Sequence, residues 1–256
     1  MIESRIKPLV AEFIGTFALI FIGVLSIAGV HIAGAPETMA NLASIGLAHG
    51  LTIAVMVAAL GAISGGHFNP AVTLGFVVTR RISLLKGAAY WGAQLLGASV
   101  AAVIISAAFG PATVAGATPS VAIDVAPLAA VVMEAVTTFF LVLVVFGCAV
   151  DSRAPANVYP LAIGLTVALD IMAIGPITGG AMNPARAFGP ALAGNHWASQ
   201  YVYWIGPLLG GALAALLYQW LMKAPAKKAD DVTITLAATD KKAETADIPA
   251  EETASV

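Results

Sequence analysis

Two stretches of the chain decide its fold: ISGGHFNPAVTLG at residues 63–75 and ITGGAMNPARAFG at residues 177–189. Each has a Gly-Gly pair followed by Asn-Pro and then a run of moderately apolar residues. Because proline has no N–H group, it fits the first turn of a helix, where that group would lack a partner. Residues 69–79 and 183–192 are therefore predicted to be helices. Both are too short to cross a bilayer, which takes about 20 residues.

Apolar stretches long enough to span a membrane lie on both sides of these short segments. Hydrophobic residues make up 59% of the 256 residues and charged residues only 10%, whereas soluble domains are roughly one-quarter charged. The first stretch has no clear cleavage site, so it is expected to remain as a helix rather than be removed as a signal peptide. The sequence thus predicts an all-α membrane protein with six transmembrane helices, near residues 8–30, 43–63, 87–108, 128–150, 158–176 and 201–222.

The two halves of the chain match each other. AEFIGTFALIFIG at 11–23 parallels MEAVTTFFLVLVVFG at 133–147, and AYWGAQLLGASVAA at 89–102 parallels VYWIGPLLGGALAA at 202–215. Each copy holds three spans and one short helix. Since three is odd, the second copy must enter the membrane from the opposite side, so a twofold axis in the bilayer plane relates the copies. We expect a channel domain at 8–222, with repeats at 8–108 and 128–222 joined by an extracellular loop at 109–127.

This inversion brings the two short helices together as re-entrant half-helices whose N-termini meet near the middle of the membrane. Lipid cannot satisfy the non-helical backbone at 64–68 and 178–182, so these segments must be buried in protein or line water. Each helix N-terminus carries about half a positive charge, which disfavours cations between them. The amides of Asn69 and Asn183 can donate hydrogen bonds to a passing water oxygen. These features predict a passive pore that conducts neutral molecules and excludes protons and ions.

Positive charges indicate the orientation, because short loops rich in Lys and Arg stay cytoplasmic. Both termini are therefore expected in the cytoplasm, as residues 1–7 and as a disordered tail at 223–256, where Ala, Lys, Asp, Glu and Thr dominate. The opposite side carries one basic residue, Arg186. We expect a location in the cell (plasma or inner) membrane. The basic residues on the cytoplasmic side are Arg5, Lys7, Arg80, Arg81, Lys86, Arg153, Lys223, Lys227 and Lys228.

The motifs Asn69-Pro70-Ala71 and Asn183-Pro184-Ala185 resemble the signature of the aquaporin, or major intrinsic protein, family. Two copies, each after a Gly-Gly turn and at matching places in an inverted six-span repeat, form a highly specific pattern. The resemblance covers about residues 8–222. It implies a water channel in a lipid bilayer, assembled as a homotetramer with one pore in each subunit.

Four residues line the selectivity filter in that family, and matching to the motifs places them at His49, Ile171, Gly180 and Arg186. The Arg186 guanidinium would act as a fixed cation that repels other cations. This quartet looks like that of a plant vacuolar (tonoplast) subgroup associated with water and ammonia passage. Strict water channels have phenylalanine, histidine and often cysteine beside the arginine. The wider, more apolar filter here would favour ammonia, although residues 109–127 lack the third-loop histidine of those plant channels.

Other functional classes fit the sequence less well. Glycerol facilitators of the family typically have aspartate directly after Asn-Pro-Ala-Arg, whereas this chain has Ala187, and the Tyr203-Trp204 pair resembles the water-selective branch. An ion-coupled transporter also uses inverted repeats and broken helices. The sequence shows no nucleophile elbow, phosphate loop or metal-ligand cluster, so no enzyme activity, metal or cofactor is expected. A net charge of -2 leaves no basic surface for nucleic acid.

Several other residues allow more than one interpretation. Glu12 and Glu134 occupy equivalent places and are predicted to accept hydrogen bonds from the loops ahead of the half-helices; the alternative is proton transport. His67 is predicted to support the first half-helix, with a pH gate as the alternative. Asp170, next to Ile171, could face the pore, pair elsewhere or be protonated.

The glycines of the spans and the single cysteine are predicted to serve packing. Cys148 is expected to be an inert packing residue. Ten glycines in the spans are expected to let helices approach closely. They are Gly15, Gly23, Gly46, Gly50, Gly92, Gly97, Gly164, Gly206, Gly210 and Gly211.

Overall fold

The computed structural model describes residues 2–34, 38–155 and 157–222, so the tail expected at 223–256 lies outside the described residues. The described chain is helical. Its helices are α1 (Ile2–Ile32), α2 (Met39–Ser64), α3 (Pro70–Val78), α4 (Leu84–Phe109), α5 (Pro111–Gly116), α6 (Pro127–Val145) with the π-helical segment η1 (Phe146–Val150), α7 (Tyr159–Thr178), α8 (Pro184–Gly194) and α9 (Val202–Met222).

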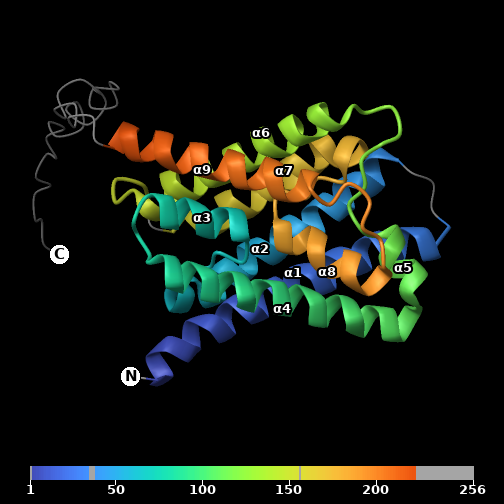
Figure 1. Cartoon of the computed structure of the whole chain (residues 1–256), viewed down its shortest axis with the longest axis horizontal. Helices are drawn as coiled ribbons and strands as arrows, with labels where there is room; N and C mark the ends of the chain where they lie inside the picture. The colour runs from blue at the N-terminus through green and yellow to red at the C-terminus, as the bar shows by residue number, and fades with distance from the viewer. Residues whose placement is uncertain (1, 35–37, 156, 223–256) are drawn as a thin grey trace, which may run out of the picture. The chain divides into compact units, whose positions relative to one another are not determined.

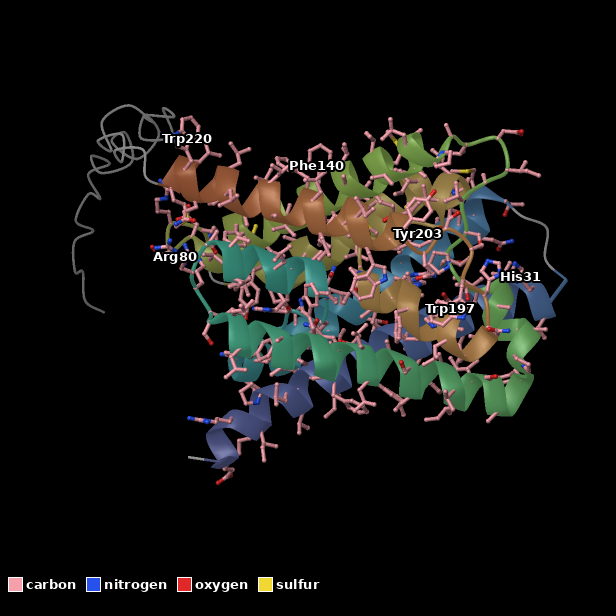
Figure 2. All side chains as sticks on the ribbon, viewed as in Figure 1. His31, Arg80, Phe140, Trp197, Tyr203 and Trp220 are labelled. Carbon is pink, nitrogen blue, oxygen red and sulfur yellow. The ribbon has the colours of Figure 1, made fainter. Side chains whose placement is uncertain are left out.

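Six of these elements are long and apolar enough to cross a membrane: α1, α2, α4, α6 with η1, α7 and α9. The six-span prediction is thereby confirmed. Large apolar side chains point outward from them, as Phe140 and Trp220 do in Figure 2. These two side chains are 50% and 68% exposed. An outer surface of this kind suits lipid rather than water. The chain is therefore a multi-pass integral membrane protein.

The ends of two segments differ from the predicted bounds. Helix α1 begins at Ile2, so most of the predicted N-terminal segment 1–7 is helical; an exposed Glu3–Lys7 ion pair one turn apart continues the helix beyond its apolar part. The predicted loop 109–127 contains α5, which starts at Pro111 after Gly110 in a left-handed conformation (φ +88°). Val114 of α5 is fully buried, and Ala115 lies against Gly194 of α8. The loop is ordered there because it packs on the second half-helix.

Helix packing follows the inverted repeat. Helix α1 packs on α4 in the first repeat, α6 packs on α9 in the second, and α2 and α7 pack on each other between the repeats. Each half-helix contacts the last span of the other repeat, α3 on α9 and α8 on α4. Figure 1 shows α3 and α8 end to end between α9 and α4. The two half-helices are therefore held in the middle of the bundle.

Glycines permit the closest of these contacts. A Cβ on Gly97 would collide with the carbonyl oxygen of Phe13, and a Cβ on the equivalent Gly210 would collide with that of Ala135. These are backbone approaches between helices, as predicted from the sequence. Gly92 does not fit the prediction, because nothing lies within 4 Å of a Cβ built there. It faces outward on α4 and is exposed.

Candidate functional site

The segments that lead into the half-helices share an unusual backbone. In each one, both glycines and the residue before the asparagine have positive φ angles, a conformation that costs little only for glycine. The values repeat from one segment to the other: +98°, +65° and +47° at Gly65, Gly66 and Phe68, then +83°, +57° and +51° at Gly179, Gly180 and Met182. The matching Gly-Gly pairs in the sequence therefore mark matching turns.

Glu12 holds the first of these segments. Its Oε1 accepts hydrogen bonds from Ser64 Oγ (2.6 Å) and from the backbone N–H of His67 (3.0 Å). Its Oε2 accepts one from the backbone N–H of Phe68 (2.7 Å). The Tyr90 hydroxyl donates to the Ser64 carbonyl at 2.8 Å. A carboxylate at 0% exposure thus has several donors, as a buried acid requires.

Glu134 holds the second segment in the same way. It accepts from Thr178 Oγ1 (2.7 Å) and from the backbone N–H groups of Ala181 (2.9 Å) and Met182 (2.7 Å). The Tyr203 hydroxyl donates to the Thr178 carbonyl at 2.8 Å. The structure therefore places both acids in the scaffold behind the loops, and neither is among the residues that line the central cavity.

The two asparagines connect the repeats. Asn69 Oδ1 accepts from the N–H of Ala71 (2.8 Å) at the start of α3, and Asn69 Nδ2 donates to the Met182 carbonyl (2.9 Å) in the opposite segment. Asn183 makes the equivalent bonds from the other repeat: its Oδ1 accepts from the N–H of Ala185 (3.0 Å), and its Nδ2 donates to the Phe68 carbonyl (2.9 Å). An amide NH₂ has two N–H groups. Each asparagine therefore keeps one N–H beyond the bond that joins the loops.

A narrow central cavity, with a volume of about 30 Å³ for water-sized molecules, lies beside these asparagines. Its wall combines polar groups with a larger apolar part. Pro70, Ala71, Pro184 and Ala185 are buried in the half-helices and are not among the lining residues. The lining residues are Leu19, His49, Ile53, Gly66, His67, Asn69, Val72, Leu141, Val145, Ile163, Val167, Ile171, Gly180, Ala181, Met182, Asn183 and Arg186. All four residues predicted for the filter thus border one cavity.

Two of those four carry the polar chemistry. His49 Nδ1 lies 2.9 Å from the Ile45 carbonyl. Because a carbonyl only accepts, the hydrogen of the neutral ring is assigned to Nδ1, which leaves Nε2 as an acceptor. Arg186 is 4% exposed, and its Nε and Nη1 have no hydrogen-bond partner among the described residues. A buried guanidinium that forms no ion pair among the described residues has donors to offer to molecules in the cavity.

His67 belongs to both the scaffold and the cavity wall. Its Nδ1 lies 3.1 Å from Thr73 Oγ1, and its ring stacks on Phe76 with 4.3 Å between centroids. Gln94 Nε2 donates to Thr73 Oγ1 (2.9 Å) and to Glu12 Oε2 (2.8 Å). Reasoning from the sequence missed Thr73, Gln94 and the two tyrosines. A glutamine inside an otherwise apolar span was the signal that could have found Gln94.

The remaining singled-out residues lie elsewhere. Asp170 is 8% exposed, its Oδ2 has no hydrogen-bond partner among the described residues, and it is not part of the cavity wall. Cys148 lies in η1, is only partly buried, and is also absent from the wall. Within the described part of the chain, no group of three or more His, Cys, Asp or Glu side chains could hold a metal ion.

Comparison with known proteins shows the same architecture. The family described as Major intrinsic protein matches residues 2–218. The chain is 44% identical over 223 residues to aquaporin TIP4-4 from Zea mays, covering 86% of this chain and 88% of that protein. It is 42% identical over 220 residues to aquaporin TIP2-1 from Arabidopsis thaliana, covering 84% and 87%.

A solved structure also shares the fold. The X-ray structure of the aquaglyceroporin from Plasmodium falciparum matches with a TM-score of 0.74 at 24% identity, covering 86% of this chain and 97% of that chain. The family match over residues 2–218 and the extended similarity to plant proteins show that the chain belongs to the major intrinsic protein family, the family of the aquaporins.

Proposed function

We propose that the chain is a passive membrane channel that conducts water and ammonia and excludes protons and ions. The observation that carries the proposal is the reciprocal pair of hydrogen bonds from Asn69 to the Met182 carbonyl and from Asn183 to the Phe68 carbonyl. These bonds hold the N-termini of α3 and α8 beside one central cavity. The aquaporin names of the relatives support water as a solute.

Proton and ion exclusion rests on the charge at the centre of the cavity. Two helix N-termini place partial positive charge there. The remaining N–H of each asparagine donates to the oxygen of a passing water, which must then point its hydrogens outward and cannot relay a proton through the centre. The Arg186 guanidinium adds a second positive barrier. Neutral molecules that accept hydrogen bonds meet no such penalty.

Ammonia passage rests on the filter. Ile171 supplies an apolar wall, and Gly180 leaves space because it has no side chain. A side chain at position 180 would be strained (φ +57°), and its Cβ would lie 3.1 Å from Ile171 Cα. His49 Nε2 offers an acceptor, which suits the three N–H groups of ammonia. A filter with few hydrogen-bonding groups lowers the penalty for a solute that replaces water's hydrogen bonds poorly.

Stopped-flow measurements on proteoliposomes test this function. We expect water and ammonia fluxes above those of empty vesicles, a low activation energy for water, and glycerol flux near the empty-vesicle value. Fast glycerol flux with slow ammonia flux would favour the alternative, a glycerol or small-solute facilitator. Saturable flux that depends on an ion gradient would instead indicate a coupled transporter.

The assembly and its orientation are part of the proposal. A homotetramer follows from the family resemblance, and light scattering of the purified protein tests it. Cytoplasmic termini follow from the basic residues: Arg80 lies at the end of the bundle opposite His31 (Figure 2), and Arg81 and Arg153 are exposed as well. Labelling of single cysteines introduced beside Arg80 or His31, in a Cys148→Ser background, tests the orientation in intact cells.

The expected cell-membrane location gains no support from the relatives, which are plant aquaporins of the TIP group. Native membranes can be separated into fractions and each fraction tested for this protein, which decides between the cell membrane and an internal membrane.

A further inference from the structure

Helix α1 has no side chain at the point where it passes the filter. A Cβ built on Gly23 would overlap His49 Nε2 and would lie 2.7 Å from Cδ2 and 2.9 Å from Cε1 of the same ring. Carbon atoms in contact are normally about 3.5–4.0 Å apart. The His49 ring therefore occupies the space that any other residue at position 23 would fill.

Two glycines of α1 meet an aromatic ring: Gly15 meets Phe68, which does not line the cavity, and Gly23 meets His49, which does. Gly97 and Gly210 meet the backbone of a neighbouring helix, as the sequence predicted for the whole set. At Gly23 the three nearest atoms all belong to the His49 side chain. The glycine thus makes room for a residue that lines the cavity, and its absent side chain has a consequence for the pore rather than for helix packing.

The His49 ring is held by a hydrogen bond on its other edge, and α2, which carries it, cannot move away from α1 because it is already in close contact with α7. His49 Nδ1 donates to the Ile45 carbonyl at 2.9 Å. At the next residue of α2, a Cβ on Gly50 would collide with the Gly164 carbonyl of α7, so these two backbones are already in close contact. A group added at position 23 must therefore displace the ring, and the open space beside the ring is the cavity.

The second repeat shows the complementary solution. When Glu12 is aligned on Glu134 and Ile45 on Ile163, Gly23 corresponds to Val145 and His49 to Val167. Both valines line the cavity. In the second repeat, α6 and α7 each contribute a medium-sized valine, whereas in the first repeat α1 contributes a glycine and α2 a large ring. The two pairs divide the available volume in different ways at matching points of the pore.

We propose that Gly23 is a specificity-determining position of the channel, because its missing side chain lets the His49 ring withdraw from the cavity and so sets the width of the filter. The inference rests on the proposed function, in which His49 is a filter residue. Gly23 acts through His49 and is a positioning residue that does not touch the solute.

The test compares Gly23→Ala with Gly29→Ala in proteoliposomes. Both substitutions lie in α1 and add the same methyl group and helix propensity, but nothing lies within 4 Å of a Cβ at Gly29. A displaced ring makes the filter narrower and more polar. For Gly23→Ala we expect ammonia permeability to fall roughly tenfold, equivalent to a barrier about 1.4 kcal/mol higher, with a smaller loss of water permeability. For Gly29→Ala we expect both fluxes to equal those of the wild type.

A second background identifies the path of the effect. His49→Val removes the ring. In that background, adding Gly23→Ala should leave the water and ammonia permeabilities equal to those of His49→Val alone, because the nearest group that the added methyl would meet is gone. If Gly23→Ala does not fold alone, the double variant must restore helical content and the elution volume of the wild type.

Equal behaviour of Gly23→Ala and Gly29→Ala would overturn the role of Gly23 and leave the proposed function intact. So would an effect of Gly23→Ala that persists without the ring, or a fold that the double variant fails to restore. A wild-type protein that conducts neither water nor ammonia would instead overturn the proposed function, and the filter role of Gly23 with it.

Discussion

The two segments that lead into the half-helices share one backbone but differ in chemistry. Residues 64–69 and 178–183 have the same turns, a buried glutamate behind each, and a tyrosine that donates to the first carbonyl of each. The side chains around them diverge. The first repeat has His67, Thr73 and Gln94 where the second has Ala181, Ala187 and Pro207, and the second has Arg186 where the first has Val72.

This difference separates the scaffold from the selectivity of the pore. Residues that are the same in both repeats hold the backbone of the loops. Each repeat has one such loop, so each needs its own copy of these residues. Residues that differ give each half of the pore its own chemistry: a hydrogen-bonded histidine in the first half and an unpaired guanidinium in the second. Substitutions in the shared set should therefore damage folding, whereas substitutions in the differing set should change which solutes pass.

The largest effect is expected from the shared glutamates. Glu134→Ala leaves the Ala181 and Met182 N–H groups and the Thr178 hydroxyl without their acceptor, at about 1–3 kcal/mol for each unsatisfied group. We expect the variant to lose several kcal/mol of stability, measured by unfolding in detergent. Glu12→Ala should lose a similar amount.

Glu3→Ala is the matched control for the glutamates. It removes a carboxylate whose partner is Lys7, and both side chains are mostly exposed (65% for Lys7 and 79% for Glu3). A pair of that kind contributes at most about 1 kcal/mol. Comparable losses for Glu3→Ala and Glu134→Ala would contradict a clamping role for the buried acids.

The next effect tests the charge that only the second repeat carries. Arg186→Val installs the residue found at the equivalent position 72. Loss of the guanidinium widens the filter and removes its positive barrier, so glycerol permeability should rise roughly tenfold, for a barrier lowered by about 1.4 kcal/mol, and cation exclusion should weaken. Val72→Ala, a change in the other half of the same cavity, should alter glycerol flux much less. Unchanged selectivity in Arg186→Val would remove this residue from the filter.

A smaller change of selectivity is expected at Ile171. Ile171→His adds a polar wall beside Arg186, so ammonia permeability should fall while water permeability stays near that of the wild type. Ile53 is the equivalent residue of the first repeat and also lines the cavity. The ammonia-to-water ratio should respond less to Ile53→His, measured in the same vesicles. Equal losses of water and ammonia in Ile171→His would show that the substitution blocks the pore rather than tuning it.

The smallest effect is expected away from both segments, at the loop after η1. Asp151 accepts hydrogen bonds from the Arg153 guanidinium and from the Tyr218 hydroxyl (3.0 Å). The bonds from Arg153 lower the pKa of Asp151 well below its usual value. A lowered carboxyl pKa stabilises the fold at pH values above the unfolded pKa of about 3.9, and the stabilisation fades as the pH falls from there toward the folded pKa.

The corresponding measurement is thermal unfolding of Asp151→Asn and of the wild type across pH. We expect the wild type to be slightly more stable at pH 7 and the difference to shrink as the pH falls below about 4. Water flux at pH 7 should not change, because Asp151 is not part of the cavity wall. A difference in stability that grows on acidification would contradict the ion pair.

Much of the fold could be predicted from the sequence, because length, hydropathy and proline position are local signals. Pro70 and Pro184 fix the starts of the half-helices, and the odd number of spans in each repeat fixes their inversion. The first residues of α1 were missed because hydropathy records the apolar length of a helix and not its continuation into water. Helix α5 was missed because its order depends on contacts with α8, a segment far away in the sequence.

The site was predictable as a set of residues but not as a network. Matching the two repeats located Asn69, Asn183 and the glutamates, whereas the crossed bonds to the Phe68 and Met182 carbonyls involve backbone atoms, which carry no sequence signal. The hydrogen bonds of Gln94 and the space that Gly23 leaves for His49 depend on how α1, α2, α3 and α4 pack together. Such contacts between distant segments become visible only in three dimensions.

The most direct test of the central claim measures water and proton permeability in the same proteoliposomes. Two helix N-termini that meet beside the central cavity should give fast water flux with a low activation energy, while proton flux stays at the level of empty vesicles. Proton flux that rises together with water flux, or the absence of water flux in vesicles that contain the folded protein, would contradict it.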